Sequence, residues 1–139
     1  MLLVVDANII FSALITKSKT FDIFLINKLT KKFEFIAPEF LLIEVEKHSG
    51  EIIEKSNLNP KELSEILEFL KEEIEFIPFN EFNKLAKQAE KTSPHKKDTQ
   101  YFALALKYNC PIWSQEKRFK KQSKTSIYST TELLKELKP

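Results

Sequence analysis

Short apolar runs alternate with longer amphipathic stretches along the chain. The first run, Leu2–Val5, is continuous and rich in β-branched residues, which is typical of a strand buried on both faces. Similar runs predict strands over residues 33–37, 75–78, 111–114 and 126–128. Apolar residues at helical spacing predict helices over residues 9–15, 21–29, 38–50, 60–74, 82–89, 98–109 and 130–137. Because strands and helices alternate with connections too long for hairpins, we expect a three-layer α/β fold with a central parallel sheet flanked by α-helices.

The composition is typical of a soluble globular protein and predicts one domain over residues 1–139, with 42% hydrophobic and 30% charged residues. No apolar run is long enough to span a bilayer, and Asp6 interrupts the first run, so we expect neither a membrane partner nor a signal peptide. A single cysteine, Cys110, excludes an intramolecular disulfide and suits the cytoplasm. Gly50 is the only glycine, and one glycine is too few for a glycine-rich phosphate loop or a dinucleotide-binding fingerprint.

Charge is nearly balanced overall but unevenly distributed. The net charge of +2 excludes a general affinity of the whole molecule for polyanions. Five basic residues nevertheless fall in one short segment: Lys117, Arg118, Lys120, Lys121 and Lys124. Such a cluster forms either a solvated face or a path for a phosphate backbone.

Four acidic residues stand at element ends or beside apolar helix faces. Asp6 follows the first strand, Asp98 begins the helix over 98–109, and Glu116 follows the strand over 111–114. Glu44 flanks the apolar stripe of the helix over 38–50. Taken singly, Asp6 and Asp98 are equally well explained as helix caps, and Glu44 and Glu116 as surface residues.

The four acids gain weight when they are considered together. Only three of the 20 acidic residues are aspartates, and two of these, Asp6 and Asp98, stand where an acid would enter a cleft at strand ends. Carboxylates in one cleft raise each other's pKa unless a cation neutralises them. Oxygen ligands without a cysteine or histidine pair suit Mg²⁺ or Mn²⁺, which serve phosphate chemistry. We therefore expect the four carboxylates to surround one cleft, within metal-bridging reach of one another.

Four segments resemble the motifs of the PIN domain family of metal-dependent ribonucleases, which includes VapC-type toxins. The segments are residues 4–14, 38–44, 98–105 and 111–119, in the family's order. The resemblance implies a PIN-like fold and a Mg²⁺- or Mn²⁺-dependent endoribonuclease whose products carry a 5′-phosphate and a 3′-hydroxyl. It also implies that RNA is the substrate, that an antitoxin protein is a possible partner, and that the chain forms a homodimer. Asp6, Glu44, Asp98 and Glu116 would hold the metal, and the polar side chains of Asn8 and Ser114 would orient the site.

The fourth segment departs from the family pattern at two positions. The family commonly has aspartate where Glu116 stands, and often a second aspartate where Arg118 stands. Glu116 is one methylene longer and still able to reach a metal. Arg118 reverses the charge, so that it either opposes a second cation or binds phosphate. We expect it to point outward along the basic segment and to contribute to the RNA path with Lys117, Lys120, Lys121 and Lys124.

Two alternative functions remain open from the sequence. Asp6 would serve as an aspartyl-phosphate nucleophile in a receiver or phosphatase, although the usual second acid beside it is replaced by Ala7 and Asn8. Alternatively, the chain is a catalytically weakened PIN-like module that only binds RNA or a protein.

For the homodimer, we expect exposed apolar surface at Phe21, Phe24, Leu25, Phe40 and the helix over 61–74.

Overall fold

The fold is built on one sheet of five parallel strands. The computed structural model describes residues 1–16 and 19–137. In chain order the strands are β1 (Leu2–Val5), β2 (Glu34–Pro38), β3 (Ile74–Ile77), β4 (Ile112–Trp113) and β5 (Ile127–Tyr128). They lie side by side in the order β3-β2-β1-β4-β5, with every neighbouring pair parallel. The predicted parallel sheet is confirmed, and β1 lies at its centre.

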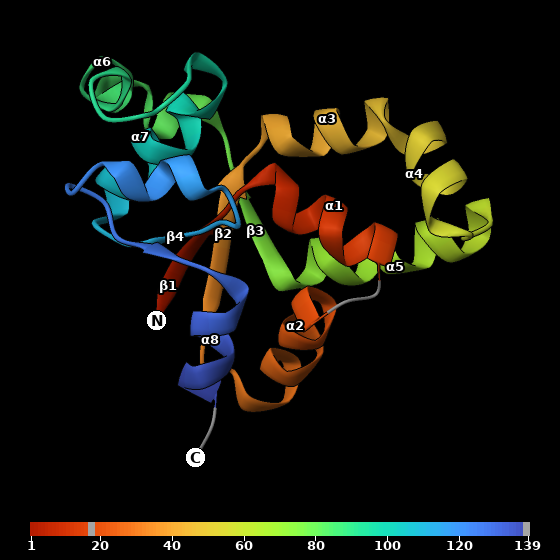
Figure 1. Cartoon of the computed structure of the whole chain (residues 1–139). Coiled ribbons are helices and arrows are strands. Elements are labelled where there is room, and N and C mark those ends of the chain that lie inside the picture. The colour runs from red at the N-terminus through yellow and green to blue at the C-terminus, as the bar shows by residue number, and fades with distance from the viewer. Residues whose placement is uncertain (17–18, 138–139) are drawn as a thin grey trace.

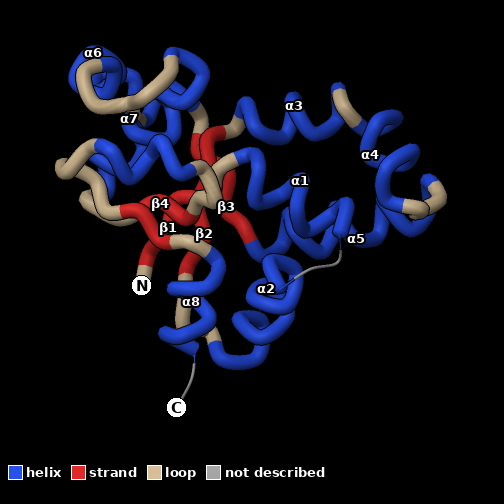
Figure 2. Tube along the Cα trace, viewed as in Figure 1, coloured by secondary structure: helices blue, strands red, loops and turns tan. Residues whose placement is uncertain are grey.

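Eight α-helices accompany the sheet in the described part of the chain. They are α1 (Ala7–Thr16), α2 (Lys19–Thr30), α3 (Phe40–Lys47), α4 (Ser49–Ser56), α5 (Pro60–Glu73), α6 (Ala86–Glu90), α7 (Thr99–Tyr108) and α8 (Thr130–Leu137). Figures 1 and 2 show α2 and α8 on one side of the sheet and α6 and α7 on the other. This is the predicted three-layer arrangement. None of the described helices is both long and apolar enough to cross a membrane.

The core is tightest where α2 meets the sheet. The ring of Phe24 on α2 packs 5.0 Å from that of Phe35 on β2 and 5.1 Å from that of Trp113 on β4. All three side chains are buried. The indole Nε1–H of Trp113 donates a hydrogen bond to Thr130 Oγ1 at the start of α8, 3.1 Å away. These contacts fix α2 and α8 to one face and hold β4 beside β1, which positions the strand ends that carry polar residues.

The structure corrects the predicted helix over residues 38–50. Pro38 ends β2 and does not begin a helix, and α3 begins at Phe40. The helix α3 then ends at His48, and a separate helix, α4, which was not predicted, follows it. Gly50, expected as the helix end, lies in the first turn of α4, where an added Cβ would meet no atom within 4 Å. Its sequence signal was misleading because this position does not need a glycine.

Two other segments form tighter turns than the sequence suggested. The helix expected over residues 82–89 begins as a 3₁₀ turn, Asn83–Leu85, and only its second half is the short α6; another 3₁₀ turn, Phe79–Glu81, precedes it. Residues Lys117–Lys121, at the centre of the basic segment, form a 3₁₀ turn called η4. Phe119 is buried within η4 and packs 5.0 Å from the ring of Phe102 on α7, so this turn is anchored to the body of the protein.

The apolar surface expected for a homodimer is exposed only in part, at Leu25. Phe24 is fully buried, Phe21 packs 5.8 Å from Phe69, and Phe40 packs 5.5 Å from Tyr101. The layer of helices therefore covers these rings, because α2 and α5 pack against each other. The exposed apolar side chains of α2 are Leu25, Ile26 and, most of all, Leu29 at 86% exposure.

Candidate active site

The four predicted acids come from four different parts of the fold and line one cavity of about 570 Å³. Asp6 follows β1, Glu44 lies on α3, Asp98 precedes α7, and Glu116 lies between β4 and η4. The cavity therefore opens at the carboxyl end of the two central strands, where parallel sheets place their binding sites. Its remaining walls are formed by Ala7, Asn8, Phe11, Phe40, His48, Lys97, Tyr101, Arg118 and Phe119.

Asp6 is the most constrained of the four acids. Its side chain is only 3% exposed, and Oδ1 accepts a hydrogen bond from the backbone N–H of Ile9 at 3.1 Å. Asp6 therefore caps α1 and lines the cavity at the same time, so a role as helix cap and a position in the cleft are compatible. Burial raises the pKa of Asp6 to about 6, and the nearby Asp98 carboxylate raises it further, against the lowering effect of its hydrogen bonds.

Ser114 connects Asp6 to the strand that carries Glu116. The Ser114 hydroxyl donates to Asp6 Oδ2 and accepts a hydrogen bond from the backbone N–H of Glu116 at 3.0 Å. Ser114 is buried, and its own backbone N–H donates to the carbonyl of Tyr128 on β5 at 3.0 Å. Because the serine is held from three sides, it fixes the orientation of the Asp6 carboxylate. Asn8 lines the same cavity from the first turn of α1.

Asp98 and Tyr101 form the side of the cavity that α7 provides. Partial burial raises the pKa of Asp98, opposed by the positive charge of Arg118. Burial also raises the pKa of Tyr101 far above its usual range, so its phenol stays neutral and can donate a hydrogen bond. Tyr101 is one turn after Asp98, and its side chain is buried.

Two of the four acids are paired with neighbouring basic side chains. Glu44 Oε2 lies 3.7 Å from His48 Nε2, and Glu116 Oε1 lies 3.1 Å from Arg118 Nε. The hydrogen bond from Arg118 lowers the pKa of Glu116. Among residues 1–16 and 19–137, no group of three or more histidine, cysteine, aspartate or glutamate side chains is arranged to hold a metal ion. The acids share one cavity, but the expected metal-bridging reach is not met, because these pairs engage two of them.

The chemistry of the cavity still fits a divalent cation at Asp6 and Asp98. Burial and mutual repulsion both act against ionisation of these two carboxylates, and a bound cation reverses both effects. The available donors are oxygen atoms, which suit Mg²⁺ or Mn²⁺. Glu44 and Glu116 line the same cavity, each beside a basic side chain.

We had expected Arg118 to point outward, away from the cavity, and the structure shows that it does not. Its side chain lines the acidic cavity and also a second hollow that it shares with Thr92, Pro94, Lys121 and Gln122. Its positive charge reaches both Glu116 and Asp98. Arg118 therefore lies at the rim, between the acids and the rest of the basic segment.

The other basic residues of the segment have different surroundings. Lys120 Nζ pairs with Glu132 Oε1 on α8, which directs its charge away from the cavity. Lys117, Lys121 and Lys124 are exposed. Gln122 holds the segment in place, since its amide group donates to the carbonyls of Phe119 and Thr125 and accepts from the N–H of Thr125. The path expected for RNA is thus a rigid turn with three exposed lysines beside Arg118.

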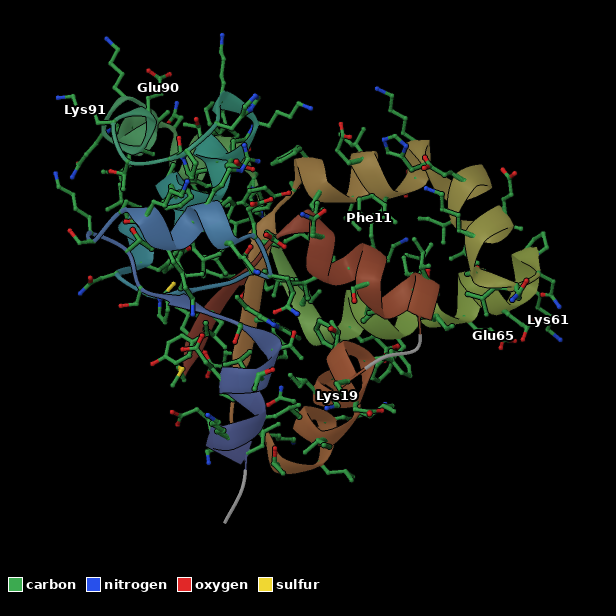
Figure 3. The ribbon with its side chains drawn as sticks, in the orientation of Figure 1. Phe11, Lys19, Lys61, Glu65, Glu90 and Lys91 are labelled. Carbon is green, nitrogen blue, oxygen red and sulfur yellow. The ribbon has the colours of Figure 1, made fainter. Side chains whose placement is uncertain are left out.

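Sequence reasoning missed several residues of the cavity. Lys97 directly precedes Asp98, and this neighbour in sequence was a usable signal. His48 lies one helical turn after Glu44, a spacing visible in the sequence, and lines the cavity. Figure 3 shows Phe11 between α1 and α3, and nothing in the sequence separated it from a core phenylalanine.

The receiver alternative does not fit this site. An aspartyl-phosphate nucleophile must be open to the phosphate donor, whereas Asp6 is 3% exposed and both of its carboxylate oxygens accept hydrogen bonds.

The fold and the cavity define an α/β protein with an acidic site at the carboxyl edge of a parallel sheet. A family model of the PIN domain matches residues 4–137, so the chain belongs to the PIN domain family. One solved structure, of VapBC2 from Rickettsia felis bound to a DNA fragment from their promoter, contains a chain with a TM-score of 0.65 and 17% identity. The alignment covers 93% of this chain and 98% of that one, which supports the PIN-like fold. No curated protein sequence matches the chain.

Proposed function

We propose that this protein is a Mg²⁺- or Mn²⁺-dependent endoribonuclease that hydrolyses RNA phosphodiester bonds. The observation that carries the proposal is the meeting of four carboxylates from four separate parts of the fold in one cavity. A purely structural role does not explain this convergence, since it places a buried aspartate with a raised pKa beside a second acid. Membership of a family of nucleases and the basic turn at the cavity rim support the same function.

Each residue has a role in this proposal that follows from its position. Asp6 and Asp98 hold the cation, with Glu44 and Glu116 as further ligands. Ser114 orients Asp6 through its hydroxyl, and Asn8 contributes a polar side chain at the cavity mouth. Lys97 and Arg118 attract the phosphate of the substrate. A bound Mg²⁺ or Mn²⁺ would stabilise negative charge on the phosphodiester and help to generate the nucleophile from water.

The direct test compares two matched aspartate substitutions. Single-stranded RNA is incubated with Mn²⁺ and with wild-type protein, Asp6→Asn or Asp22→Asn. Asp22 is the one aspartate that lies outside the cavity, exposed in the first turn of α2. We expect cleavage by the wild type and by Asp22→Asn, with 5′-phosphate ends, and none by Asp6→Asn. Equal cleavage by all three proteins would trace the activity to a contaminant and contradict the proposal.

A second candidate is a PIN-like module that binds RNA or a protein without catalysis. The specific observation in its favour is the ion pair between Glu116 and Arg118, which engages an acid where a metal ligand is expected. This function predicts that the purified protein binds no Mn²⁺ by calorimetry and cuts no member of a broad RNA panel, while it still binds RNA or a protein partner. Measurable Mn²⁺ binding that Asp6→Asn abolishes would decide for the nuclease.

The proposal extends to a biological setting in the cytoplasm, with an antitoxin protein as partner and a homodimer as the assembled form. The related fold in VapBC2 supports the antitoxin partner. The exposed side chains of Leu25, Ile26 and Leu29 on α2 support the homodimer. Light scattering should report a dimer that Leu29→Lys dissociates, while Tyr108→Lys, at an exposed aromatic on α7, leaves it intact. A wild-type monomer at micromolar concentration would contradict the homodimer.

A further inference from the structure

Another hollow, different from the one beside Thr92 and smaller than the acidic cavity, adjoins that cavity between α1 and α4. It has a volume of about 300 Å³ and is lined by Phe11, Ile15, His48, Glu51, Ile52 and Lys55. Phe11 and His48 also line the acidic cavity, so the two spaces meet along this pair of side chains. Phe11 and His48 therefore form the boundary between the two spaces, and neither has a role among the proposed catalytic residues.

Phe11 and His48 form an ordered aromatic pair. Their ring centroids are 6.0 Å apart and the planes meet at 83°, an edge-to-face arrangement. His48 is held from both sides, with Nε2 3.7 Å from Glu44 and Nδ1 3.3 Å from Glu51. Glu51 is in turn paired with Lys55 at 2.8 Å. The imidazole is fixed in orientation, and with 42% of its side chain exposed it still offers ring surface to a ligand.

The distribution of charge decides which part of a nucleic acid suits each space. The cations that line the acidic cavity, Lys97 and Arg118, are absent from the smaller hollow. The one lysine that lines the smaller hollow, Lys55, is already paired with Glu51. The carboxylates of Glu51 and of Glu44, which lines the acidic cavity, lie on either side of His48 and disfavour a phosphate. An uncharged, flat group with hydrogen-bond donors on its edge suits both the rings and the carboxylates. RNA bases in single strands have this chemistry and are commonly recognised by stacking on aromatic side chains.

We propose that this hollow is a subsite for one unpaired RNA base, stacked on the ring of His48 and bordered by Phe11, next to the phosphate that is cleaved. The inference rests on the proposed nuclease function and adds a requirement to it, namely that one base of the RNA is turned out of its stack into the hollow. The volume suits a single base or nucleoside and is far below the extent of a protein interface. The phosphate chain then runs from the basic turn across the acids, with the base on the opposite side.

The test measures binding of short single-stranded RNAs without divalent metal, so that binding is separated from cleavage. The fluorescent base 2-aminopurine, which is quenched when it stacks, is placed at each position of the RNA in turn. Wild type is compared with His48→Ala and with His48→Phe, which keeps an aromatic ring. Tyr108→Ala, at an exposed aromatic on α7, is the matched control.

We expect quenching at one position, retained in His48→Phe and Tyr108→Ala and lost in His48→Ala. His48→Ala should bind about 5- to 150-fold more weakly. An RNA with an abasic residue at the quenched position should lose the same factor with wild type and little more with His48→Ala, because the base and the ring then act through one contact.

Four results would overturn the inference. If wild type binds and cleaves RNA but shows no quenching and no effect of His48→Ala, the subsite is wrong while the nuclease function stands. The subsite is also wrong if His48→Ala lowers the affinity for abasic RNA by the same factor as the affinity for intact RNA. It is wrong as well if His48→Ala leaves RNA binding unchanged but abolishes binding of the protein encoded by the adjacent reading frame. If wild type neither binds nor cleaves RNA, the proposed function fails and the subsite fails with it.

Discussion

Replacing Asp6 by asparagine should stabilise the metal-free protein at neutral pH while it removes activity. Burial raises the pKa of Asp6 to about 6 in the folded protein, from 3.8 in the absence of such surroundings. Asparagine fills nearly the same volume and carries no charge. Its amide oxygen can accept from the N–H of Ile9, and its NH₂ group can donate to the Ser114 hydroxyl, which changes there from donor to acceptor.

The sign and size of the effect follow from the two pKa values. Below pH 3.8 Asp6 is protonated in the folded and unfolded states alike, so the group costs nothing. As pH rises toward 6 the unfolded state ionises first, and the folded wild type loses stability; above pH 6 the loss is complete. At about 1.4 kcal/mol for each pKa unit, the rise from 3.8 to about 6 corresponds to about 3 kcal/mol.

The assay is urea denaturation of wild type, Asp6→Asn and Asp22→Asn in the presence of a chelator, from about pH 3.5 to about pH 8. The difference in unfolding free energy between Asp6→Asn and wild type should grow by about 3 kcal/mol from the acid end to neutral pH, whereas Asp22→Asn should follow wild type. Mn²⁺ should then stabilise wild type and not Asp6→Asn. A difference that stays constant with pH would refute the argument from burial.

Three further predictions test other parts of the structure. Arg118→Ala should tighten Mn²⁺ binding in calorimetry, and Arg118→Asp should tighten it further, because the guanidinium pairs with Glu116 and its charge reaches Asp98; unchanged affinity in both variants would show that Arg118 does not act on the metal site. Lys121→Ala should reduce the slope of RNA affinity against salt by about one charge, and Lys120→Ala by less, since Lys120 is paired with Glu132; equal slopes would place the RNA elsewhere. Phe24→Ala should lower the unfolding free energy by about 3–5 kcal/mol in urea titrations, since its buried ring contacts two strands; a loss below about 1 kcal/mol would contradict this packing.

The elements that the sequence predicted well are those with a strong local pattern. The apolar run Leu2–Val5 could only be stable as a buried strand, and the helix at 60–73 begins with a proline and a capping box formed by Asn59 and Glu62. The order of four motif segments also predicted the family, which the match over residues 4–137 confirms. The helix break at His48 and the 3₁₀ turns carried no such pattern, because their geometry depends on what packs against them.

By itself the sequence determined the parallel sheet, the family and the set of acids that meet at the sheet's carboxyl edge, because strand periodicity and strand ends are local properties. The functional roles of those acids stay predictions, as do the extent of the domain and the RNA path. Only the tertiary structure decided that Arg118 faces the acids, that Lys120 turns to Glu132, and that Phe11 joins His48 beside the cavity. These outcomes depend on charges and rings from distant segments, whose distances are set by how the helices pack on the sheet.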